Sequence, residues 1–132
     1  MGPNSLGKAM AAASSGMNTQ AFRLRVVSEN LSNADTHGYQ RKLVTFKNEM
    51  DAVTGQVGVQ VSDVTLDRSG GGIIFDPDHP LANNEGYVAM SNVDMMIELA
   101  DAREAGRTYE ANLSTFKQAT EMYTGLLDLL RR

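Results

Sequence analysis

Apolar residues recur at seven-residue intervals near both ends of the chain. From about residue 5 to residue 33 two interleaved rows share this interval. One row consists of Met10, Met17, Leu24 and Leu31, and the other of Leu6, Ala13 and Val27, with the polar Gln20 between the last two. An alternation of three and four residues between apolar positions is typical of the narrow seam of a coiled coil. We therefore predict a long N-terminal helix that packs against another helix.

The same pattern is stronger in the C-terminal segment, from about residue 92 to residue 132. One row consists of Met95, Ala102, Tyr109, Phe116, Tyr123 and Leu130, and a second follows four residues later, at Leu99, Gly106, Leu113, Thr120 and Leu127. A third row, Ala105, Ala119 and Leu126, widens the apolar stripe and is interrupted by Asn112. Asn92 is expected to cap this helix, because its side-chain oxygen can accept a hydrogen bond from a free backbone N–H of the first turn.

Between the two helices the pattern changes to short runs broken by glycine and proline. Val57, Val59 and Val61 alternate with polar or small residues, which is typical of a half-buried strand. Residues 43–46, 73–75 and 87–90 are further strand candidates, and residues 70–72 and 76–80 are expected to form turns. The predicted fold is mainly α with a small β-rich insert, and its long N- and C-terminal helices pair as a coiled-coil-like bundle. We divide the chain into an N-terminal tail or cloning remnant (1–5), the first helix with its cap (6–37), the insert (38–91) and the second helix (92–132).

Composition narrows the classes of function. The 132 residues include no cysteine, which excludes disulfides, thiol catalysis and cysteine-ligated metal centres. The formal net charge of −4 argues against a nucleic-acid partner. No apolar run approaches the roughly 20 residues that a membrane-spanning helix needs, so membrane insertion is not expected. Residues 1–16 do not resemble a secretory signal.

Few side chains suggest a catalytic or metal site. The two histidines, His37 and His79, could bind a metal ion together with Asp35, Asp76 or Asp78. However, Asp-Pro-Asp-His-Pro is also an ordinary turn composition. Asp76 and Asp78 have no accompanying nucleophile or second base. We favour the turn, and we expect no enzyme activity and no catalytic, cofactor-binding or metal-ligating residue.

The two seams are compatible with two classes of function. Two helices of this length carry more apolar surface than one antiparallel pair covers, which favours association with further helices. An ordinary bundle closed on itself explains the same periodicity equally well. Periodicity alone does not decide between them.

Three stretches resemble the flagellar basal-body rod protein family. Residues 30–39, Asn-Leu-Ser-Asn-Ala-Asp-Thr-His-Gly-Tyr, resemble the motif that ends the N-terminal helix in rod and hook proteins. Residues 76–82 and 86–94 look like the segment before the C-terminal helix in the family's C-type proximal rod subunits, and residues 107–112, Arg-Thr-Tyr-Glu-Ala-Asn, resemble a pattern within that helix. The matching residues are Asn30, Asn33, Thr36, Gly38 and Tyr39 at the end of the first helix, and Gly86, Tyr87, Asn92, Val93, Asp94, Arg107, Tyr109, Ala111 and Asn112 in and before the second.

The resemblance implies a structural subunit of the bacterial flagellar rod that is made in the cytoplasm and exported through the flagellar type III apparatus. The subunit would polymerise in the periplasm through its terminal helices and transmit torque from motor to hook. The implied partners are other rod proteins, further copies of the chain and the adaptor that links the rod to the membrane ring; no cofactor is implied. The expected helix-packing interface comprises Leu6, Met10, Met17, Leu24, Val27, Leu31, Met95, Leu99, Tyr109, Leu113, Phe116, Tyr123, Leu127 and Leu130.

The alternative function is a soluble coiled-coil adaptor or export chaperone, which would form a closed oligomer and bind one partner. A small hydrolase that uses the carboxylates near His79 has little support in the residues.

Overall fold

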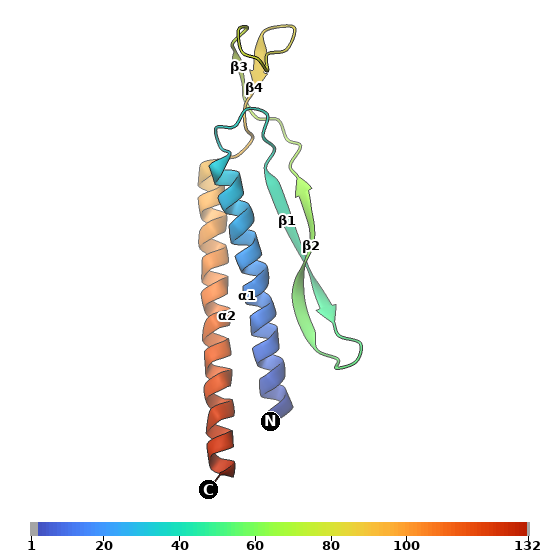
Figure 1. The fold of residues 1–132 in the computed structure, drawn as a ribbon, viewed down its shortest axis with the longest axis vertical. Coiled ribbons are helices and arrows are strands. Elements are labelled where there is room, and N and C mark those ends of the chain that lie inside the picture. Colours follow the sequence, from blue (N-terminus) through green and yellow to red (C-terminus); the bar gives the residue numbers. More distant parts are fainter. Residues whose placement is uncertain (1–2, 132) are drawn as a thin grey trace.

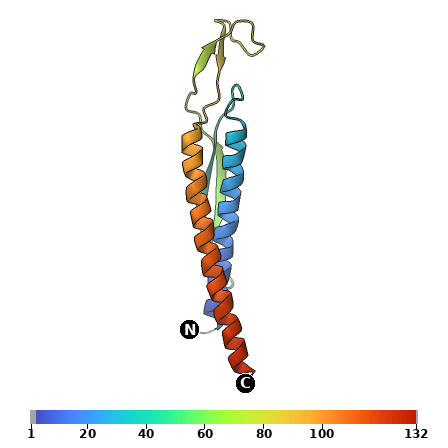
Figure 2. The ribbon, with the colours of Figure 1, turned by 90° about the vertical axis from the view of Figure 1, so that its left-hand side faces the viewer.

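Two antiparallel helices form the long axis of the molecule in the computed structural model, which describes residues 3–131 (Figure 1). α1 spans Pro3–Ser32 and α2 spans Met95–Leu130, so the predicted order of helix, β-rich insert and helix is confirmed. Both termini lie at the same end of the helix pair, where α2 extends beyond α1 (Figures 1 and 2). Residues 1 and 2 of the expected N-terminal tail lie outside the described residues, whereas residues 3–5 belong to the first turn of α1.

The larger part of the insert is a β-hairpin that lies along α1. β1 (Lys42–Met50) and β2 (Val57–Leu66) pair antiparallel, and a bulge interrupts their register between Thr45 and Phe46. Both strands are longer than the sequence pattern indicated, and most of the added residues are exposed. α1 is therefore packed between α2 on one side and the hairpin on another (Figure 1).

The smaller part of the insert is a two-stranded lobe beyond the helix ends, at the opposite end of the molecule from the termini (Figure 1). β3 (Ile73–Phe75) and β4 (Tyr87–Ala89) pair antiparallel at the positions that the sequence predicted. Gly86 precedes β4 with a φ of 84°, a conformation that favours glycine. A side chain there would also meet the Phe75 ring, which packs edge-on against Tyr87 with 5.3 Å between ring centroids.

The core is narrow and consists largely of small side chains. The buried apolar residues are Leu6, Ala13, Val26, Val27, Val88, Ala105 and Ala119. Gly16 is also buried, and a Cβ placed on it would lie 2.7 Å from Nδ2 of Asn112 on α2. The two helix backbones therefore approach closely at this point.

The face of α2 that packs on α1 is one edge of the predicted stripe, extended by Glu98. Glu98, Ala105 and Ala119 are buried, whereas Leu99 is 48% exposed and Leu127 is 40% exposed. Ala105 and Ala119 belong to the third row of the predicted stripe, and the first row is half-buried at residues 102, 109 and 116. The stripe therefore faces α1, with Leu99 and Leu127 at its exposed edge.

The predicted cap of the second helix is wrong by two residues. Asp94, not Asn92, is the N-cap of α2, and its Oδ1 accepts a hydrogen bond from Met96 N at 2.9 Å. Asn92 lies in the extended segment before the helix, where its side chain bonds three other backbone groups.

Candidate assembly interface and its polar junction

The predicted packing residues fall into three groups in the single chain. Leu6 and Val27 are buried. The half-buried group comprises Met10, Met17, Leu24, Leu31, Tyr109, Leu113 and Phe116. The exposed group comprises Met95, Leu99, Tyr123, Leu127 and Leu130. A contact of these residues with a neighbouring chain stays a prediction.

The end of α2 is exposed on every side. Each residue from 120 to 131 is exposed, and six of the side chains in this stretch are large and apolar: Met122, Tyr123, Leu126, Leu127, Leu129 and Leu130. Leu130 reaches 81% exposure. Apolar surface contributes about 25 cal/mol per Å² when it is removed from water. This end of the helix is therefore a strong candidate for contact with another chain. None of the helices in the described residues is long and apolar enough to span a membrane.

At the other end of the helix pair, Asn30 is the centre of a buried polar junction. Its Oδ1 accepts hydrogen bonds from Tyr39 OH at 2.8 Å and from Lys42 N at 2.9 Å. Its Nδ2 donates to Lys42 O at 3.0 Å and to Glu98 Oε2 at 3.3 Å. These bonds use both donors and both acceptor positions of the amide, so this nearly inaccessible side chain is fully satisfied.

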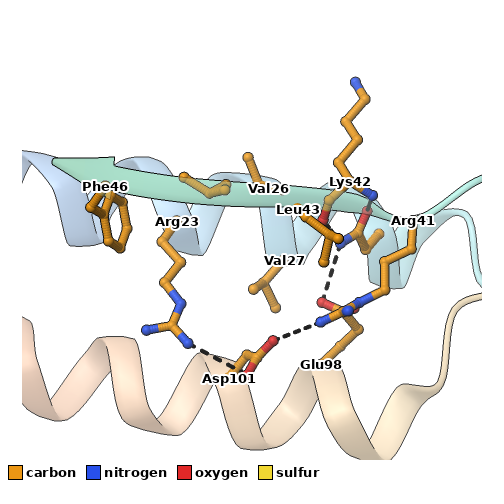
Figure 3. Close-up of a pocket in the computed structure, with 11 residues that line it drawn as sticks. Arg23, Val26, Val27, Arg41, Lys42, Leu43, Phe46, Glu98 and Asp101 are labelled. Atoms are coloured by element: carbon orange, nitrogen blue, oxygen red, sulfur yellow. Dashed lines mark hydrogen bonds and ion pairs between the residues drawn. The ribbon is translucent and has the colours of Figure 1, made fainter. Parts of the chain in front are cut away.

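Glu98 connects the junction to α2 and is fully buried. Its carboxylate accepts a short hydrogen bond from Arg41 Nε, and Arg41 Nη2 also bonds Asp101 Oδ2 at 2.8 Å (Figure 3). On the same side of α2, Arg23 reaches Asp101 and Glu104 at 3.4 Å each. The ion pairs therefore join α1, α2 and the start of β1.

Two pKa shifts describe the electrostatics of the junction. Burial disfavours the charged form of Arg41, but the hydrogen bond and the charge of Glu98 outweigh it, and the pKa of Arg41 lies above its ordinary value. The pKa of Tyr39 is also raised, first by burial and then by the charge of Glu29. Arg41 is therefore charged and Tyr39 neutral in the folded chain at neutral pH.

A hollow of about 290 Å³ lies beside this junction, between α1, α2 and β1 (Figure 3). Val26, Val27, Leu43 and Phe46 form its apolar wall, and the Arg41 and Glu98 side chains close one side. The polar groups here already bond one another. The arrangement supports a structural joint rather than a reacting centre.

Asn92 brings the insert into the same junction. Its Oδ1 accepts a hydrogen bond from Arg41 N at 2.6 Å, and its Nδ2 donates to the carbonyls of Asp67 at 2.8 Å and Ser69 at 2.9 Å. Since Asp67 follows β2 and Asn92 precedes α2, one side chain fixes the crossing of three chain segments. Asn30, Tyr39 and Asn92, which the sequence assigned to two separate motifs, thus form one network.

The other residues of the first motif end α1. Asn33 Nδ2 donates to Glu29 O at 2.8 Å, and Thr36 Oγ1 donates to Asn33 Oδ1 at 3.0 Å. Gly38 has a φ of 74°, and its N–H bonds Ala89 O of β4 at 3.0 Å. The motif therefore turns the chain and ties the helix end to the lobe.

The second motif is more dispersed. Val93 is half-buried and its N–H bonds the Ser91 hydroxyl at 3.2 Å. Asn112 lies against Gly16, whereas Arg107 and Ala111 are exposed on α2. The structure therefore does not bring all of the predicted motif residues together.

The two histidines do lie together, as a metal site would require. The rings of His37 and His79 are 4.6 Å apart and meet edge to face. His79 Nδ1 accepts a hydrogen bond from Leu81 N at 3.0 Å, which is a turn contact. Residues 3–131 contain no cluster of three or more side chains suited to hold a metal ion.

Arg23, Arg41, Glu98 and Asp101 are the residues of this region that the sequence interpretation missed. Arg41 and Glu98 are 57 positions apart in the chain, so local patterns do not pair them. One signal was available: Glu98 falls seven residues before Ala105, in the row that packs on α1, where an acidic residue needs a partner.

Comparison with known proteins finds two family models, whose matched residues include most of α1 and most of α2. Residues 10–40 match the family model described as flagella basal body rod protein, and residues 84–129 match the model described as flagellar basal body rod FlgEFG protein C-terminal. The chain is 44% identical over 126 residues to the flagellar basal-body rod protein FlgC of Agrobacterium fabrum, which covers 90% of this chain and 91% of the relative. It is 34% identical over 125 residues to FlgC of Salmonella typhimurium, with 89% and 92% covered. For FlgC of Bacillus subtilis the identity is 32% over 139 residues, with 89% and 93% covered. Similarity of this extent, over both helices and the insert, shows that the chain belongs to the FlgC family of flagellar basal-body rod proteins.

Proposed function

We propose that this chain is a structural subunit of the proximal rod of the bacterial flagellar basal body, and that it joins its neighbours through α1 and α2. The observation that carries the proposal is the exposed end of α2. There Leu126 is 40% exposed, Leu129 64% and Leu130 81% in the single chain. When the helices of neighbouring subunits cover this apolar surface, its removal from water stabilises the assembly.

The partners that fit this role are other rod proteins, further copies of the chain, and the adaptor between rod and membrane ring. The names of the relatives, which are basal-body rod proteins, support this assignment. The rod lies in the periplasm, and export through the flagellar type III apparatus would bring the chain there. The absence of cysteine from the 132 residues suits that route, because no disulfide has to form or break.

We propose that the subunit transmits torque from motor to hook, and the geometry of the helix pair supports this role. The two helices run along the long axis of the molecule, so many copies side by side would share a twisting load (Figure 1). The junction around Asn30 and Glu98 joins α1, α2 and β1 at one end of the helix pair, and it thereby fixes the position of the insert relative to the helices.

The test is to purify basal bodies from cells that carry the chain and to identify their proteins by mass spectrometry. The chain should be found in the rod fraction. Leu24→Asp and Leu129→Asp should each abolish rod assembly and motility, whereas Arg68→Asp, at an exposed position of the insert, should not. A chain that is absent from basal bodies, and that forms a small closed oligomer in dilute solution, would instead be an adaptor or chaperone.

A further inference from the structure

One face of α2, near its start, is an open apolar groove with a basic rim. The groove has a volume of about 540 Å³ and is lined by α2 residues alone, with Met96, Leu99 and Ala100 as its apolar part. Met96 is 75% exposed and Leu99 48%. Arg103, Glu104, Arg107 and Thr108 also line the groove. Glu104 pairs with Arg23 at 3.4 Å, whereas Arg103 and Arg107 are exposed and have no ion-pair partner among residues 3–131.

A complementary face is present near the end of the same helix. Met122, Leu126 and Leu129 have the i, i+4, i+7 spacing of one helical stripe, and they are 55%, 40% and 64% exposed. The adjacent row carries Glu121 and Asp128, which are exposed and likewise lack an ion-pair partner in the described part of the chain.

Gly125 lies between the two acidic residues in that row. A Cβ at Gly125 would meet no atom within 4 Å, so the helix backbone is open to a neighbour there. A small residue, Ala100, occupies the groove at the other end of α2. Small residues on both faces permit a close approach of two helices, and the arginine side chains are long enough to reach the acidic row.

We propose that the last turns of α2 in one copy of the chain dock in the groove formed by the first turns of α2 in a second copy. This inference rests on the proposed function and names one of its contacts. The two faces lie near opposite ends of a 36-residue helix, which is about 54 Å long, so one molecule cannot bring them together. Because the two faces are different, each added copy uses one face and leaves the other free, so the contact builds an open chain of subunits or, where the rotation closes, a ring.

Charge reversal tests the docking in solution. The protein is examined by sedimentation velocity over a range of concentrations at low salt. Arg103→Glu with Arg107→Glu should weaken self-association about tenfold or more, and so should Glu121→Arg with Asp128→Arg, because each change places like charges together. All four substitutions together should restore the association. Arg68→Glu, on the insert, serves as the matched control and should leave association unchanged.

Circular dichroism of every variant should match the unsubstituted chain, since all four positions are exposed. An unsubstituted chain that stays monomeric overturns the docking. So does a pair of substitutions without effect, or a fourfold variant that does not regain association.

The absence of cysteine allows the contact to be mapped. A chain with Ala100→Cys is mixed with a chain with Gly125→Cys and treated with a mild oxidant. A disulfide between the two chains is expected, whereas Arg68→Cys, at an exposed position of the insert, should not pair with position 100.

The same cysteine variants in basal bodies separate this inference from the proposed function. A chain that is present in the rod, but whose position 100 cross-links to a different rod protein, leaves the rod role standing and overturns docking between copies. A chain that is absent from basal bodies removes the rod role, while the solution experiments still decide the docking.

Discussion

Arg41→Met isolates the contribution of the buried junction to stability. The substitution keeps most of the side-chain volume but removes the cation that bonds Glu98 and Asp101. Glu98 is fully buried and would keep only the 3.3 Å hydrogen bond from Asn30 Nδ2. Removing one partner of a buried ion pair costs about 3–5 kcal/mol, because the remaining charge is neither solvated nor compensated.

We expect a loss near the lower limit, about 3 kcal/mol, because the Asn30 amide still contacts the carboxylate and the Arg41 side chain is itself 17% exposed. Such a loss is a large part of the 5–15 kcal/mol that is ordinary for a folded domain. The measurement is urea unfolding at neutral pH, followed by the circular dichroism of the helices, with the free energy of unfolding obtained by linear extrapolation.

Two further variants make the result specific. Glu98→Met in the Arg41→Met background should recover most of the loss, because a buried ion pair replaced by apolar side chains of similar size is often neutral. Arg68→Met, at an exposed position that forms no ion pair within residues 3–131, should change stability by less than about 0.5 kcal/mol. If Arg41→Met alone lost less than about 1 kcal/mol, or if the second substitution added to the loss, Glu98 would not be a buried charge held by Arg41.

Three other predictions address separate parts of the fold. Gly16→Leu should destabilise the helix pair by about 1–3 kcal/mol through contact with Asn112, and Asn112→Ala should relieve part of that loss in the same unfolding assay. Hydrogen bonds from the Thr54 and Val53 amides lower the pKa of Asp51, so their contribution to the hairpin turn is complete above the carboxyl's ordinary value of 3.8 and is lost as the pH falls through the lower folded value. The amide chemical shifts of this turn, followed by NMR in acid and compared with Asp51→Asn, check the sign. In the isolated chain, amide hydrogen exchange should be slow around Asn30 and fast beyond residue 120; uniform protection along α2 would contradict this gradient.

The sequence predicted both helices because seven-residue periodicity extends over several turns in each. It did not predict which edge of the α2 stripe is buried. The stripe included Leu99 as well as Ala105 and Ala119, and the structure buries the two alanines while Leu99 is 48% exposed. A hydrophobic pattern gives weight to large side chains, but the closest approach of two helices is decided by small ones.

The polar junction could be predicted only in part. Asn30 and Tyr39 were recognised as a motif that ends α1, and Asn92 as a polar residue near the start of α2. Their mutual contact depends on how the chain returns after the insert, and Asn30 and Glu98 are 68 positions apart. Neither periodicity nor spacing carries that information.

The exposed end of α2 also decides where a reporter can be attached. A fluorescent or affinity tag fused after residue 132 would lie beside the apolar side chains that we expect to meet a neighbour, and it would compete with assembly. The turn between β1 and β2 offers a better position, since Val53 is 94% exposed and the hairpin lies on the other side of α1 from α2 (Figure 1). A tag inserted there would follow the chain into the basal body while both helices remain free to pack.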